Sequence, residues 1–201
     1  MTADGGAGPR IPPGTTRHEV GWTAWVVGRA SGWFTGTNPP NLFLTLGRNP
    51  RLFRGWLRFA SRLMPGGRLP RRETELVILR VAHLRGCAYE LEHHRRLGRR
   101  AGITDADLAR VAEGPSAPGW TARERALLTA ADELVRERDL GDGTWQALTR
   151  HLDTPRVIEL VLLVTHYDML ATTIGALRIE PDRDAVSRPR LPRPRGRRRR
   201  T

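Results

Sequence analysis

The sequence predicts an all-α protein, and three observations lead to this prediction. Apolar residues recur at helical spacing, most clearly between Asn41 and Met64. Capping patterns open several segments, such as Thr121 with Glu124 three residues later. No segment alternates apolar and polar residues as a half-buried strand would, and no turn pair of the Asn-Gly kind joins two apolar runs. At 201 residues the chain is long enough to bury one hydrophobic core without disulfides or a structural metal ion.

Each predicted helix is delimited by Gly, Pro or capping residues. An apolar stretch with three Trp residues, from Glu19 to about Trp33, ends at the Gly and Pro residues of positions 35–40. The later helices are predicted from Asn41 to Met64 with a break near Asn49 and Pro50, from after Pro70 to Leu84, from about Cys87 to Ala101, from Thr104 to Ala112, from Thr121 to about Glu137, from Asp142 to Leu152, and from Pro155 to Leu177 behind a Thr154 cap. The helices that end at Leu84 and Leu177 are apolar on nearly every face, which predicts that they are buried and that the protein forms an oligomer.

Composition divides the chain into three parts. Residues 1–16 are rich in Gly and Pro and are expected to form a flexible arm, residues 17–180 the helical domain, and residues 181–201 a disordered tail rich in Arg and Pro. The tail holds nine Arg and two Asp, a net charge of +7, which is more than half of the formal +13 of the whole chain. Binding to nucleic acid or another polyanion is therefore expected only through this tail, whose alternative role is that of a solvated extension.

The cysteine count and the hydropathy limit the class of protein. The single cysteine, Cys87, excludes an internal disulfide and a zinc site built of cysteines alone. No run of about 18 apolar residues is present. The N-terminus lacks a charged segment followed by an apolar one, so neither a membrane span nor a signal peptide is expected, and the expected location is the cytoplasm.

The segment from Cys87 to His94 carries the most chemical information. If this segment is helical, Cys87, Glu90 and His94 recur at i, i+3 and i+7 and share one helix face. A thiol, a carboxylate and an imidazole on one face can exchange protons. Gly86 is the expected break before this helix, and a helix start favours negative charge, so the thiolate of Cys87 is expected to be somewhat stabilised.

These residues resemble the carboxymuconolactone decarboxylase family, which includes the alkylhydroperoxidase-like (AhpD-like) proteins. The resemblance rests on RETELVILRVAHLRGCAYELEHHRRLGRRAGITDADLARV, about residues 71–111, with weaker agreement in ERALLTAADEL and ELVLLVTHYDMLATTIGAL. It covers roughly residues 40–180. It implies an AhpD-like helical bundle that assembles into trimers, hexamers or similar rings.

The resemblance also implies which residues form the site. In the peroxidase branch a glutamate is followed twelve positions later by a Cys-x-x-Cys pair, and a histidine stands four residues after the second Cys. Glu75, Cys87 and His94 match this pattern, but Glu90 occupies the position of the second cysteine. A dithiol peroxidase needs a second sulfur to resolve the oxidised one as a disulfide, and Cys87 alone cannot do this within the chain.

The remaining set of Glu75, Glu90 and His94 suits proton transfer, because two carboxylates and an imidazole together can provide an acid beside a base. The cation that would hold a substrate carboxylate is Arg80, Arg85 or Arg95, among which the sequence does not choose. No cofactor is required and no metal is expected, because Glu90 and the neighbouring histidines lack a recognised zinc spacing.

Two further residues are candidates for substrate binding. Tyr89 is expected to pack with its hydroxyl at the rim of the pocket, and His166 either lines a second wall of the pocket or lies at a subunit interface. The leading hypothesis is cofactor-free acid/base chemistry on a small organic acid or lactone. The alternatives are a thiol-dependent hydroperoxide reductase (peroxiredoxin activity) that uses Cys87, and a non-catalytic oligomeric scaffold whose basic tail binds a polyanion.

Overall fold

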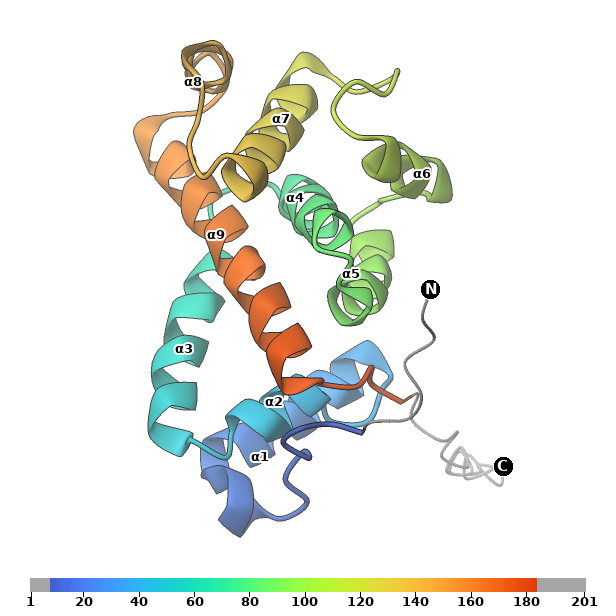
Figure 1. The fold of residues 1–201 in the computed structure, drawn as a ribbon, viewed down its shortest axis with the longest axis vertical. Helices are drawn as coiled ribbons and strands as arrows, with labels where there is room; N and C mark the ends of the chain where they lie inside the picture. Colours follow the sequence, from blue (N-terminus) through green and yellow to red (C-terminus); the bar gives the residue numbers. More distant parts are fainter. Residues whose placement is uncertain (1–7, 184–201) are drawn as a thin grey trace, which may run out of the picture.

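The computed structural model describes residues 8–183, and this part of the chain is all-α, as predicted (Figure 1). The remaining positions of the predicted basic tail, 184–201, lie outside the described residues. The helices are α1 (Arg17–Thr35), α2 (Asn41–Leu46), α3 (Pro50–Leu63), α4 (Arg71–Leu84), α5 (Ala88–Arg100), α6 (Asp105–Glu113), α7 (Ala122–Arg136), α8 (Asp142–Thr149) and α9 (Thr154–Leu177).

Local capping chemistry sets most of these boundaries. The capping box predicted at Thr121 and Glu124 is present, and Thr104 forms another at the start of α6. One predicted cap is wrong: the side chain of Asp153, not Thr154, accepts a hydrogen bond from the backbone N–H of Arg156, at 3.1 Å. A carboxylate is a strong acceptor for the exposed N–H groups of a helix start, so Thr154 becomes the first helical residue.

Two helices form the centre of the molecule. α4 is buried continuously from Thr74 to Ala82, and α9 packs against α3, α4, α7 and α8. By length and composition α9 could cross a membrane, but half of its apolar window (50%) is buried within the fold, as in the core helix of a globular domain. α8 ends at Thr149, before the predicted end at Leu152, because Leu152 turns into the main core.

A tight turn folds α5 back along α4. Gly86 adopts a positive φ of 58°, which favours glycine, and the backbone N–H of Cys87 donates to Ala82 O at 2.9 Å. At the other end of the pair, Arg72 Nη1 donates to Gly102 O at 3.1 Å. The two helices are therefore antiparallel, and the start of α4 lies beside the end of α5.

α1 and α2 form a layer beneath the central helices, at the end where α9 terminates, and α3 runs from this layer along the side of α9 (Figure 1). The described part of the predicted N-terminal arm is tied to this region: Arg10 N donates to Leu177 O at 3.0 Å, and Gly14 N donates to Leu44 O at 3.2 Å. The chain beyond α9 returns to the same layer, where Arg183 O accepts from Asn38 N at 3.0 Å. Both described ends of the chain thus lie close to α2 and to the segment that precedes it.

Candidate active site

Glu75, Glu90 and His94 converge on one point between α4 and α5. His94 Nδ1 lies 2.8 Å from Glu75 Oε2, and His94 Nε2 lies 3.2 Å from Glu90 Oε2. The three residues are 0%, 3% and 2% exposed for Glu75, Glu90 and His94. The antiparallel pairing of the two helices brings together side chains that are 19 positions apart in the chain. Both nitrogens of the imidazole therefore face carboxylate oxygens, away from solvent.

The electrostatics of this cluster favour a protonated His94. Burial by itself lowers the pKa of His94, but Glu75 and Glu90 outweigh it and raise the pKa from its ordinary value of 6.5 to about 9. Arg71, one helical turn before Glu75, places its Nη2 atom 2.7 Å from Glu75 Oε1. Arg71 and His94 thus both lie against the carboxylate of Glu75, and His94 also faces the carboxylate of Glu90.

A cavity of about 680 Å³ opens beside this cluster. Glu90, His94 and Arg71 form its polar edge, whereas Glu75 stands behind His94. The ring of Tyr167 packs edge-on against His94, with the ring centroids 5.1 Å apart. Most of the remaining wall is apolar and comes from α1, α2, α3, α5 and α9, including Val27, Phe43, Leu57, Met64, Leu97 and Leu170. A cavity of this size, mostly apolar with a few convergent polar groups, is typical of a small-molecule site.

Cys87 lies close in sequence to this cluster but faces another part of the core. It caps the start of α5 and packs with Leu42, Ile174 and Ile179. It is not among the residues that line the cavity. Burial raises the pKa of the Cys87 thiol; the backbone N–H of Glu90 opposes this shift, and the Glu90 carboxylate adds to it. The expected stabilisation of the thiolate by the helix start is therefore wrong, because desolvation outweighs the helix terminus.

None of the three predicted arginines lines the cavity. Arg80 is buried, and it donates from Nε and Nη2 to the two carboxylate oxygens of Asp132 at 2.6 and 2.7 Å. Arg85 is paired with Asp168, and Arg95 is exposed. Arg71 and Arg100 line the cavity instead, one at the start of α4 and the other at the end of α5. The geometry does not support the prediction that Arg80 binds substrate, because its guanidinium donates to partners inside the fold and does not reach the cavity.

Tyr89 lines the cavity, but its hydroxyl has a structural role. The hydroxyl donates to Asp182 Oδ1 at 2.9 Å and accepts from the backbone N–H of Leu42 at 3.3 Å. Asp182 also accepts from the backbone N–H of Asn41 at 2.7 Å. Tyr89 therefore links α5 to the start of α2 and to the chain that follows α9.

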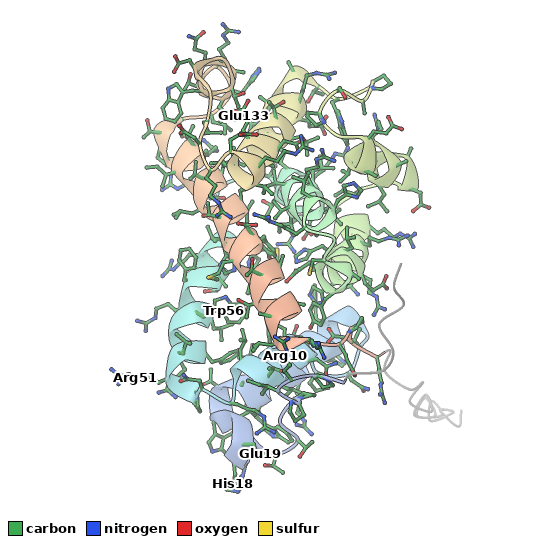
Figure 2. All side chains as sticks on the ribbon, viewed as in Figure 1. Arg10, His18, Glu19, Arg51, Trp56 and Glu133 are labelled. Carbon is green, nitrogen blue, oxygen red and sulfur yellow. The ribbon has the colours of Figure 1, made fainter. Side chains whose placement is uncertain are left out.

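His166 lies in the wall of the cavity, on α9. Its ring stacks on that of Trp56 with centroids 6.2 Å apart, and Trp56 lies between α3 and α9 (Figure 2). On its outer side the same pair borders a more open groove of about 690 Å³. Burial lowers the pKa of His166, so that its ring is neutral at pH 7. The structure thus places His166 in the wall of the cavity that α9 forms, and its location at a subunit interface stays a prediction.

Sequence reasoning missed three residues of this site. Arg71 could have been found from its spacing, because it precedes Glu75 by four residues and so shares its helix face. Arg100 reaches the cavity from the end of α5 and Trp56 from α3, and no local pattern marks either residue as part of a site. Among residues 8–183, no group of three or more His, Cys, Asp or Glu side chains has an arrangement that could hold a metal ion.

The fold and the site define a class of helical proteins that is known from solved structures. A peroxidase-related protein from Ralstonia eutropha JMP134, described as an alkylhydroperoxidase AhpD core, aligns with a TM-score of 0.75 at 19% identity, over 87% of this chain and 94% of that chain. The debrominase Bmp8 aligns with a TM-score of 0.72 at 19% identity, over 85% of this chain and 90% of that chain. A peroxidase-related protein from Silicibacter sp. TM1040 gives 0.70 at 16% identity, over 79% and 84% of the two chains. At these identities the comparisons show a shared AhpD-like fold.

The sequence itself matches the model of the carboxymuconolactone decarboxylase family over residues 50–133. These residues include α4 and α5 with all of the His94 cluster, so the match to the family model covers the candidate site. The resemblance predicted from the motif is thereby confirmed. No curated protein sequence matches the chain.

Proposed function

We propose that this protein is an enzyme that transfers protons, without a cofactor, to and from an organic acid or lactone. The observation that carries the proposal is the buried imidazole of His94 between two carboxylates, at the edge of a mostly apolar cavity. Buried groups with shifted proton affinity that meet in a cavity are typical of acid/base catalysis.

The geometry favours Glu90 as the group that exchanges protons with the substrate. Both ring nitrogens of His94 face carboxylates, so neither is directed freely at the cavity. Glu90 Oε1 is buried and has no hydrogen-bond partner among the described residues, and Glu90 lines the cavity. The step would break a C–H bond next to a carbonyl of the substrate. The proton would pass to Glu90 Oε1, and the electron pair would move into the carbonyl.

The other members of the cluster would support this step. The imidazolium of His94 lies against the carboxylate of Glu90 through Nε2, and Glu75 holds the imidazolium in place through Nδ1. When the proton returns to a different carbon the result is an isomerisation. When the carbanion instead arises by loss of CO₂, a protonated Glu90 is the donor that quenches it. Arg71 and Arg100 are the cavity cations suited to hold a carboxylate.

Cys87 receives little support as the reacting group. Peroxidase-related proteins and a debrominase share this fold, so thiol chemistry is the main rival. However, the chain has one cysteine, which packs against apolar side chains of the core, and its pKa is raised by burial. A high pKa lowers the fraction of thiolate at neutral pH, and the thiolate is the nucleophile.

The experiment follows exchange of the carbon-bound proton next to the carbonyl, for a panel of carboxylated lactones in D₂O by NMR. We expect catalysed exchange that falls at least about 100-fold in Glu90→Gln and in His94→Gln and is retained in Cys87→Ser. Glu92→Gln and His83→Gln are matched controls, because these exposed residues lie on the same two helices and should leave the rate unchanged.

Peroxide consumption with a dithiol reductant is measured on the same samples. Peroxide consumption that disappears in Cys87→Ser, together with no proton exchange on any lactone, would favour the reductase and overturn the proposal. Exchange that persists in Glu90→Gln would also overturn it.

A further inference from the structure

Four side chains that line the cavity carry a buried polar atom without a hydrogen-bond partner in the part of the chain described. These atoms are Trp56 Nε1, Arg71 Nη1, Glu90 Oε1 and His166 Nδ1. Buried polar atoms in folded proteins are nearly always hydrogen-bonded, because leaving one without a partner costs about 1–3 kcal/mol. Their accumulation around one cavity indicates that a bound molecule supplies the missing partners.

The four atoms fall into two groups. Arg71 and Glu90 belong to the charged edge, since Arg71 pairs with Glu75 and Glu90 contacts His94. Trp56 and His166 stack on each other in the wall formed by α3 and α9. The ring of Tyr167 stands between the groups, with its centroid 5.1 Å from that of His94 and 5.3 Å from that of His166. These two ring contacts place the imidazoles of His94 and His166 at most about 10 Å apart, from centroid to centroid.

Each of these two pairs of side chains favours a different functional group of a ligand. At the charged edge, Arg71 Nη1 is a cationic donor and suits a carboxylate oxygen. In the other wall, Trp56 Nε1 can only donate a hydrogen bond, whereas the neutral ring of His166 can accept one at Nδ1. A hydroxyl group both accepts and donates, so it can satisfy the indole and the imidazole together. A carbonyl oxygen can only accept.

The wall between the two groups is apolar. Leu57, Met64 and Leu170 are among its members, and the cavity of about 680 Å³ is far larger than a single small ring requires. A short organic acid would leave either the Arg71 edge or the Trp56 wall without a partner. The ligand that fills both positions has an apolar skeleton long enough to span them.

We propose that the substrate is an extended, largely apolar organic acid that carries a hydroxyl group at the end remote from its carboxylate. Arg71 holds the carboxylate beside Glu90, and Trp56 with His166 binds the remote hydroxyl. This assignment deepens the proposed function and rests on it only in calling the ligand a substrate. It replaces the small organic acid expected from the sequence with a longer molecule.

The test uses three matched probes in isothermal titration calorimetry on the full chain: 4′-hydroxybiphenyl-4-carboxylate, biphenyl-4-carboxylate without the hydroxyl, and 4-hydroxybiphenyl without the carboxylate. We expect the wild type to bind the first probe about tenfold more tightly than either of the others, which is the effect of about one well-formed hydrogen bond or ion pair. Trp56→Phe and His166→Phe should each reduce the preference for the hydroxyl, and Arg71→Gln should abolish the preference for the carboxylate. Trp33→Phe is the control, since Trp33 is 84% exposed and lies outside the cavity lining.

Equal affinity of the wild type for the two carboxylates would overturn the assignment, and this comparison depends on no variant. An unchanged hydroxyl preference in the double variant Trp56→Phe/His166→Phe, with native far-UV circular dichroism, would overturn it as well. The two proposals fail separately. Probe binding with the expected preferences but without proton exchange on any substrate refutes the enzymatic function, whereas exchange without a hydroxyl preference refutes this substrate class.

Discussion

The protonation of His94 is the most direct test of the site, because the structure gives its direction and size. The pKa of His94 is raised from 6.5 to about 9, since Glu75 and Glu90 outweigh the cost of burial. We therefore expect His94 to be an imidazolium at pH 7. Its proton should be released only about two pH units above neutrality.

The shift has a consequence for stability with a defined sign. A group whose pKa is higher in the folded protein than in the unfolded chain stabilises the fold fully below its unfolded pKa, and this contribution is lost as the pH rises through the folded value. The window therefore runs from about pH 6.5 to about pH 9. At about 1.4 kcal/mol for each tenfold change in proton affinity, the contribution of His94 is about 3 kcal/mol.

Two measurements check this prediction. Carbon-edited NMR of protein labelled at its six histidines should show one imidazole that titrates near pH 9, and this signal should be absent in His94→Gln. Urea unfolding at a series of pH values should show that the wild type loses about 3 kcal/mol relative to His94→Gln as the pH rises from 6.5 to 9.5. A His94 midpoint below pH 7, or a stability difference that grows with pH, would refute the conclusion that Glu75 and Glu90 raise the pKa of His94.

The other predictions concern residues outside the proton-transfer step. Arg80→Met should destabilise the protein by about 3 kcal/mol in urea unfolding, because buried Asp132 loses both hydrogen bonds from Arg80 and keeps the weaker contact with Arg136, whose Nη2 lies 3.5 Å away; if the double variant with Asp132→Leu is no more stable than Arg80→Met, that explanation fails. Cys87→Ser should lower stability by no more than about 2 kcal/mol and leave probe binding in calorimetry unchanged, whereas weaker binding would place the thiol in the site. Leu162→Glu, at a 41% exposed apolar position beside the outer groove, should reduce the mass measured by light scattering if the protein is the expected oligomer; a monomeric wild type would contradict that expectation.

The helices were predictable because local chemistry encodes their ends. The break at Pro50, the capping box at Thr121 and the left-handed glycine at Gly102 all act within a few residues, so spacing alone locates them. Periodicity likewise places Glu90 and His94 on one face of α5, with Cys87 directly before its first residue. Periodicity does not show that Glu90 and His94 lie at the cavity whereas Cys87 packs into the core.

Arg80 shows why the binding cation was not predictable. It lies on a helix that is apolar on nearly all sides, so its position in the sequence says only that it is buried. Its actual partner, Asp132, is 52 positions away on α7, and no local pattern connects the two. Arg71 is the first residue of the same helix, where a charged residue usually lies at the surface. Its place at the cavity depends on the packing of α5 against α4, which the sequence does not show.

Position 90 links the resemblance to the electrostatics of the site. In the dithiol branch that the motif resembles, a cysteine occupies this place, and a neutral thiol would leave the histidine facing one carboxylate. With Glu90 a second carboxylate lies 3.2 Å from His94 Nε2, and the imidazolium is stabilised from both sides. The glutamate that stands in place of the second cysteine therefore also favours the charged form of the histidine. We expect that a histidine held in this way does not act as a neutral base toward a thiol. Under the proposed function, a carboxylate oxygen of Glu90 at the cavity is the base instead.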